Sequence, residues 1–208
     1  MSRVDILDHQ IRMGLQDEGG RNVTRDEVWA AIADAQYKIV TETLILKGYQ
    51  KITLVPAQDR YPIEEEVYKL KGFVEPTTWT YRLVVIENVE DWAEKKRATT
   101  DSTQPLYALV WSKMLHLWPA PTAADALEIF TFRLPSETIT AGGDPEIPQV
   151  WDLALRYHAI ASLLRVGPQA DRYMGLFEFE MKRQAPREQR ENAGAIRKRQ
   201  HGSDDLNF

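Results

Sequence analysis

The chain has 208 residues, of which 43% are hydrophobic and 27% charged, with a net charge of -5. These values are typical of a soluble globular protein with one large domain or two small ones. The absence of cysteine excludes disulfides, thiolate metal sites and cysteine nucleophiles. No apolar run approaches the ~20 residues of a membrane span, and the first residues lack the apolar core of a secretory signal. We therefore expect a cytoplasmically made protein with no membrane partner.

Charge is distributed unevenly along the chain. The segment from Lys182 to His201 has a net charge of +5, which leaves -10 for the remainder. An acidic body does not favour nucleic-acid binding. A basic segment with few apolar residues is typical of an arm that binds an acidic partner.

Two helices are predicted near the N-terminus. Residues 4–15 carry apolar side chains at the spacing of one helical face. The sequence from Thr24 to Glu27 is a capping box, in which the hydroxyl and the carboxylate each accept from the other residue's N–H. The apolar stripe after it extends to Leu46, and Gly48 is the expected stop of this second helix.

The middle of the chain alternates apolar and polar residues, as strands do. Strands are predicted around Ile52 and Leu54 and over 67–74, 79–86, 106–111, 114–118 and 127–134. Residues 112 and 113 are expected to form a tight hairpin turn, and Asn88 to cap a short helix ending near Arg97.

Helical spacing returns after Pro148, with helices predicted to Leu164 and then over 169–184. After Pro186 the apolar pattern stops, so residues 187–208 are predicted to be disordered until bound.

The predicted fold class is α+β. Residues 1–48 and 144–186 are expected to form one helical bundle, because neither end could bury its apolar stripe alone. Residues 49–143 form an inserted antiparallel β-rich domain, and residues 187–208 form an extended C-terminal tail.

No constellation of catalytic residues is evident. Glu64, Glu65 and Glu66 are consecutive and therefore point in different directions, and Glu178 and Glu180 lie two apart on a helix. The four histidines (His9, His116, His158 and His201) lack metal-ligand spacing. Gly142-Gly143-Asp144 has no phosphate-loop context. We predict no catalytic residue, no metal ligand and no cofactor.

Two other functions remain open on the residues alone. A cell-wall hydrolase of the muramidase type would need a carboxylate pair that the sequence can neither name nor exclude. A carbohydrate-binding module could use Trp79, Trp111 and Trp118, although aromatic strand residues more often belong to a core.

Three stretches follow one another along the chain in a distinctive order. The first is the capped helix from Thr24 to Lys47 with the following Ile52–Ala57 and Arg60–Pro62. The second is the pair Leu106–Trp111 and Met114–Pro121, and the third runs from Phe130–Pro135 through Asp144–Pro148 into the next helix. In this order the stretches resemble the head-to-tail adaptor (connector) proteins of short-tailed bacteriophages.

The resemblance implies a structural, non-enzymatic virion protein assembled in the host cytoplasm. It implies a homo-oligomeric ring, commonly twelve-fold, between the portal protein and the tail nozzle protein. Genomic DNA would pass through it with transient, non-specific contact. The C-terminal segment would reach the portal through Arg187, Arg190, Ile196, Arg197, Lys198, Arg199, Leu206 and Phe208. Subunits would pack through Trp29, Trp151 and Tyr157.

Overall fold

The computed structural model describes residues 2–17, 19–20, 22–64, 67–98, 102–135, 139 and 143–201, with the backbone alone for 187–201. The chain divides into two compact units, here called the helical unit (Met1–Leu46 with Pro135–Phe208) and the β unit (Lys47–Leu134). The mixture of helices and two sheets confirms the α+β class.

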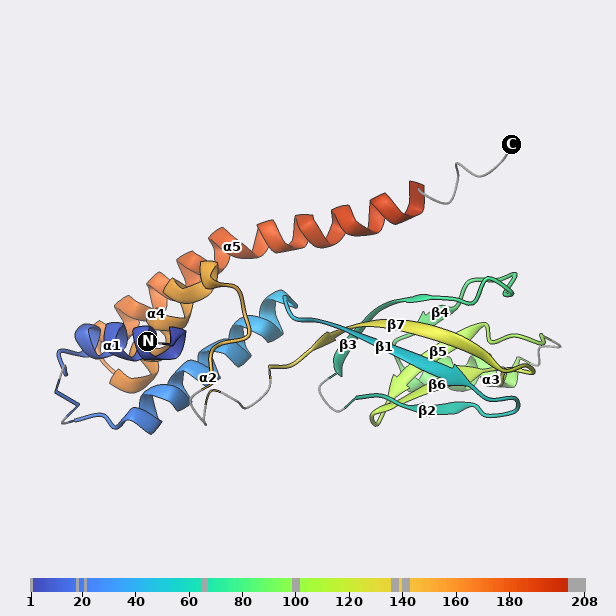
Figure 1. Ribbon diagram of the computed structural model, residues 1–208, viewed down its shortest axis with the longest axis horizontal. Coiled ribbons are helices and arrows are strands. Elements are labelled where there is room, and N and C mark those ends of the chain that lie inside the picture. The colour runs from blue at the N-terminus through green and yellow to red at the C-terminus, as the bar shows by residue number, and fades with distance from the viewer. Residues whose placement is uncertain are drawn as a thin grey trace. The chain divides into compact units, whose positions relative to one another are not determined.

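The helical unit contains α1 (Arg3–Leu15), α2 (Arg25–Thr43), α4 (Asp152–Leu164) and α5 (Pro168–His201), with the short 3-10 helix η2 (Gln149–Trp151) before α4 (Figure 1). The four α-helices contribute to one hydrophobic core. Its largest fully buried side chains include Leu7 of α1, Ile32 of α2 and Phe177 of α5. Among the described residues, no helix is long and apolar enough to cross a membrane.

The capping box of α2 is confirmed. The Glu27 N–H donates to the Thr24 hydroxyl over 3.3 Å, and the Thr24 N–H donates to the Glu27 carboxylate over 2.8 Å. Ser2 and Asp5 form the same arrangement at the start of α1. Both helices therefore begin where side chains satisfy N–H groups that have no partner within the helix.

The end of α2 differs from the prediction. The helix stops at Thr43, because Leu44 adopts a left-handed conformation with φ of 54°. Ile45 and Leu46 still enter the helical core, which explains why the apolar stripe continued past the helix. Gly48 is a strand residue: a Cβ there would lie 2.5 Å from the Thr131 hydroxyl, so the close approach of two strands requires glycine.

The β unit is a sandwich of two sheets. One sheet has the order β1-β7-β3, with β1 (Lys47–Leu54), β3 (Val67–Val74) and β7 (Asp125–Arg133). The other has the order β2-β6-β5-β4, with β2 (Arg60–Pro62), β4 (Val84–Ile86), β5 (Tyr107–Trp111) and β6 (Met114–Trp118). Their inner faces share a core that includes Leu54, Leu117 and Leu127.

The predicted hairpin is confirmed, with Trp111 opposite Met114. Ser112 and Lys113 both have positive φ, as a two-residue hairpin turn of type I′ requires. The sheet is not entirely antiparallel as predicted, since β4 and β5 run parallel. Helix α3 (Val89–Arg97), capped by Asn88 as predicted, makes the crossover that a parallel pair needs.

The strand predicted over 79–86 is reduced to β4. The residues before it find their hydrogen bonds elsewhere: the Thr80 N–H donates to the Gln104 side chain over 2.8 Å, and the Leu83 N–H donates to the Glu75 carboxylate over 3.1 Å. Side-chain acceptors thus replace the ladder of a longer strand.

The predicted extended tail is wrong for residues 187–201, whose backbone continues α5 to His201. The missing apolar stripe suggested disorder, but the segment is rich in Arg, Glu, Gln and Ala, which are strong helix formers. An existing helix can also be extended without a new nucleation cost. Pro186 lies inside this helix, where its missing N–H removes one backbone hydrogen bond.

The predicted β-rich insertion extended to residue 143, whereas the β unit ends at Leu134. Residues 144–147 already belong to the helical unit and bond to its helices α1 and α2. The Val4 N–H donates to Asp144 over 2.8 Å, the Arg3 side chain donates to the carbonyl oxygen of Ile147 over 2.6 Å, and the Glu146 N–H donates to Gln36 over 2.7 Å.

Candidate functional site

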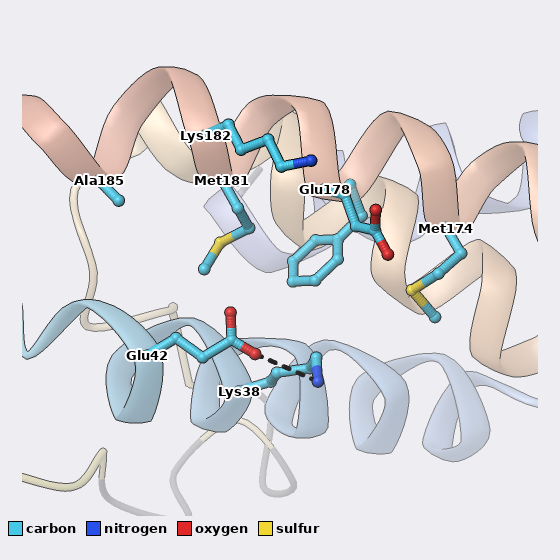
Figure 2. Close-up of a pocket in the computed structure, with 8 residues that line it drawn as sticks. Lys38, Glu42, Met174, Glu178, Met181, Lys182 and Ala185 are labelled. Atoms are coloured by element: carbon cyan, nitrogen blue, oxygen red, sulfur yellow. Dashed lines mark ion pairs between the residues drawn. The ribbon is translucent and has the colours of Figure 1, made fainter.

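A groove of about 400 Å³ lies between α2 and α5 in the helical unit (Figure 2). Helix α5 supplies most of its lining: Met174, Phe177, Glu178, Met181, Lys182 and Ala185. Helix α2 supplies Lys38 and Glu42. The groove is partly open to solvent, which suits a segment of a protein partner better than an enclosed small molecule.

The apolar part of the groove follows from helical spacing. Positions 174, 177, 181 and 185 recur every three or four residues, which brings them to one side of α5. Phe177 and Met181 are buried and form the floor, while Met174 is half-buried. Figure 2 shows the Met174 and Met181 side chains directed from α5 toward α2. Methionine adapts its shape to irregular partners, so two of them favour a binding surface.

Charged side chains border this apolar strip. Lys38 and Glu42 form an ion pair of 3.2 Å along α2, and both side chains are nearly half exposed. Glu178 and Lys182 stand on the α5 side and are exposed. An apolar floor between charged borders is the usual arrangement of a protein interface.

A buried histidine supports the floor. The ring centre of His158 on α4 lies 4.9 Å from that of Phe177, in an edge-to-face arrangement. Burial lowers the pKa of His158 and Lys38 lowers it further, while Asp34 and Glu42 act in the opposite direction. The neutral imidazole therefore packs beneath the groove at neutral pH.

The residues predicted to bind the portal are not brought into this groove. Arg187, Arg190, Ile196, Arg197, Lys198 and Arg199 belong to the backbone of α5 beyond it. Leu206 and Phe208 lie outside the described residues. The groove ends close to the start of the basic segment, because Ala185 lines the groove and only Pro186 separates it from Arg187.

The three residues predicted to pack between subunits occupy different environments. Trp151 is completely buried in the core of its own chain, so it has no surface to offer another subunit. Trp29 is half-buried, with the Arg25 guanidinium 4.5 Å from its ring centre. Tyr157 is half-buried and its ring centre lies 6.2 Å from that of Tyr173.

The residues behind the alternative functions are separated. Among the described residues, no cluster of three His, Asp or Glu side chains could hold a metal ion. Trp79 packs against the core between the sheets, whereas Trp118 packs against the smaller core under α3. Trp111 is exposed, with its ring centre 6.0 Å from that of His116. Glu65 and Glu66 lie outside the described part of the chain.

The helical spacing over 169–184 predicts the helix that carries Phe177 and Met181, but it does not predict a groove. The missing information was the partner across it, because Lys38 and Glu42 are more than a hundred residues away in the chain. The spacing of Met174, Met181 and Ala185 was the available signal.

No curated protein matches the chain significantly. The family model described as SU10 adaptor protein matches residues 1–199, which includes both units and nearly all of α5. This match covers almost the whole chain and confirms the resemblance to phage adaptor proteins. The chain therefore belongs to the SU10 adaptor protein family.

Proposed function

We propose that this adaptor is a structural, non-enzymatic virion protein that forms a ring between the portal protein and the tail nozzle protein. The family match over residues 1–199 carries the proposal. Genomic DNA passes through the ring during ejection with only transient contact. The acidic character of the chain outside its C-terminal segment supports this, since phosphates would not be held there. Assembly takes place in the host cytoplasm, and twelve copies are the expected number.

The proposed portal contact begins at the groove and continues along α5. The groove offers an apolar strip up to Ala185, and the basic segment follows directly after Pro186. A helix turns by about 100° per residue, so positions 187, 190, 197 and 198 fall within about one third of its circumference. We expect the portal segment that binds here to be acidic, with apolar residues for the groove.

Ile196, Leu206 and Phe208 are the proposed apolar contacts of the C-terminal segment, together with Arg199 as a further charge. Trp29 and Tyr157 remain the proposed subunit contacts, because both keep part of their surface exposed. Trp151 is completely buried and has no surface for such a contact.

The first test uses the full chain and purified portal rings. Deleting residues 187–208 is expected to abolish binding to portal. Replacing Arg187, Arg190, Arg197, Lys198 and Arg199 by Gln retains helix propensity and should weaken binding at least tenfold, with the loss largest at low salt. Unchanged affinity of the deletion variant contradicts the portal contact.

The matched control removes a positive charge elsewhere on the same helix. Arg172→Gln changes an exposed arginine at the other end of α5 and should leave portal affinity unchanged. Deleting only residues 202–208 separates the contribution of Leu206 and Phe208 from that of the basic residues. Negative-stain images of adaptor mixed with portal should show an added ring of adaptor on each portal particle. Portal particles without an added ring contradict the proposed function.

A further inference from the structure

The outer face of the β1-β7-β3 sheet combines lysines with aromatic rings. Pairing across the three strands arranges the residues of this face in rows. The first row contains Lys47, Phe132 and Lys69, and the second contains Tyr49, Phe130 and Gly72. Lys51 lies opposite Glu128 in a third row. We call Lys47, Tyr49, Lys51, Lys69, Lys71, Phe130 and Phe132 the lysine-aromatic face.

The side chains of this face form a surface that is both apolar and positively charged. Tyr49 is 52% exposed and its ring centre is 5.5 Å from that of Phe130. The ammonium nitrogen of Lys71 lies 5.8 Å from the Phe132 ring centre. A Cβ on Gly72 would meet nothing within 4 Å, so open space lies beside Phe130. Exposed aromatic rings with adjacent space are typical anchors of an interface.

The opposite side of the same unit carries the complementary charge. The two sheets share one core, and α3 packs on the far sheet through Trp92, Ile86 and Leu109. The exposed residues Glu87, Glu90, Asp91 and Glu94 form what we call the acidic face of α3. Glu90 and Glu94 are four residues apart in the helix and share one side of it.

Apolar surface accompanies the acidic face as well. Val84 and Val89 are exposed, and the exposed fraction of Val84 is 51%. Val84 pairs with Tyr107, which packs on the core under α3, so it lies on the same side of the sheet as α3.

The last turn of α3 carries Lys95, Lys96 and Arg97. Arg97 is exposed, whereas Lys95 lies over the Tyr107 ring and Lys96 pairs with Asp59, so both are half-buried. Each side of the β unit therefore presents apolar groups next to charges of one predominant sign.

We propose that the lysine-aromatic face of one chain binds the acidic face of α3 on a second copy of this chain. The inference rests on the proposed ring function and identifies one of its subunit contacts. Because the two surfaces are different and lie on opposite sides of one unit, the contact is head-to-tail. Repetition of such a contact closes into a ring when the rotation between copies allows it.

Nucleic acid is the other class of partner that lysines and aromatic rings can bind. The observations favour a second copy because the chain itself carries the complementary surface, with carboxylates for the lysines and valines for the aromatic rings. Complementary potentials of this kind determine partner choice and register in protein interfaces.

The experiment is sedimentation velocity of the full chain at high concentration and low salt, with two charge-reversed variants. Lys47→Glu with Lys69→Glu inverts the lysine-aromatic face, and Glu90→Lys with Glu94→Lys inverts the acidic face. The wild type is expected to self-associate, and each variant alone should associate at least tenfold more weakly. An equimolar mixture of the two variants should associate again, because one then offers two acidic faces and the other two basic faces.

A control matched to the lysine variant lowers the net charge by the same amount without changing either face. Arg165→Glu with Arg172→Glu, both exposed in the helical unit, should associate like the wild type. Circular dichroism establishes that all variants are folded. A monomeric wild type, undiminished association of both variants, or failure of the mixture to associate overturns the proposal. Loss of duplex-DNA binding in the lysine variant alone, without self-association of the wild type, would assign this face to nucleic acid instead.

Imaging the same variants on portal rings separates this inference from the proposed function. If all variants form complete rings on portal, the subunit contact is wrong while the adaptor function stands. If the wild type self-associates in solution as expected but adds no ring to portal, the proposed function fails while the contact stands.

Discussion

His158 is buried among helices α2, α4 and α5, and its protonation should affect the stability of the helical unit. Burial lowers its pKa in the folded chain below the usual value near 6.5. As the pH falls below that value, His158 becomes protonated in the unfolded chain but stays neutral in the folded chain. Stability should therefore decrease as the pH falls from about 6.5 toward the lowered pKa of the folded state.

The measurement is denaturant unfolding of the full chain at pH 7.5, 6.5 and 5.5, followed by a signal from the helical unit. The wild type is compared with the variant His158→Gln. The variant should lose part of the pH dependence because its amide does not titrate in this range. Asp34, Lys38 and Glu42 surround His158 and remain in both proteins. His9→Gln removes an exposed histidine and is the matched control. An identical pH dependence in His158→Gln and wild type would contradict the assignment.

At the scale of elements, the start of α2 depends on one hydroxyl. Thr24→Ala removes the acceptor for the Glu27 N–H and should lower the free energy of unfolding by about 1 kcal/mol. Hydrogen bonds from the Thr24 N–H and from its hydroxyl lower the pKa of Glu27. The variant keeps the N–H and loses the hydroxyl, so that pKa should rise part of the way toward its usual value. Chemical denaturation measures the first effect and an NMR titration of Glu27 the second.

Thr24→Ser is the matched control because it retains the hydroxyl. Its stability and the Glu27 pKa should stay close to those of the wild type. If Thr24→Ser is destabilised as much as Thr24→Ala, the effect comes from the methyl group, and the cap contributes little.

Sequence reasoning succeeded where short-range chemistry determines an element. The Thr24 capping box, the Asn88 cap and the turn at Ser112 and Lys113 are all present as predicted. Each depends on residues within four positions of one another, so no knowledge of the fold was needed. The ordering of the elements also followed from the change between helical and strand periodicity.

The predictions failed where partners distant in sequence decide the outcome. The sequence alone predicts a helix stop at Gly48, because its close neighbour Thr131 is distant in the chain. The α2–α5 groove was missed because its two sides are more than a hundred residues apart. The resemblance implies a subunit contact at Trp151, but the fold of its own chain buries this residue. Amphipathic periodicity indicates which face is apolar but not whether the chain or a partner covers it.

At the scale of the whole molecule, the two units have separate hydrophobic cores with no residue in common. Leu155 belongs to the helical core and Leu117 to the core between the sheets, and both are completely buried. Truncating either to Ala should cost about 2–5 kcal/mol through lost burial and a cavity. We expect each substitution to weaken mainly the unit that contains it.

Native-state hydrogen exchange, measured separately for each unit, shows which unit each substitution destabilises. Leu117→Ala should accelerate exchange in β5, β6 and β7 and leave α2 and α4 close to wild type. Leu155→Ala should do the reverse, so each variant is the matched control of the other. Equal acceleration throughout the chain in both variants would mean that the units unfold as one cooperative body. Independent unfolding would instead let the portal contacts of α5 and the subunit contacts of the β unit be altered by substitution one at a time.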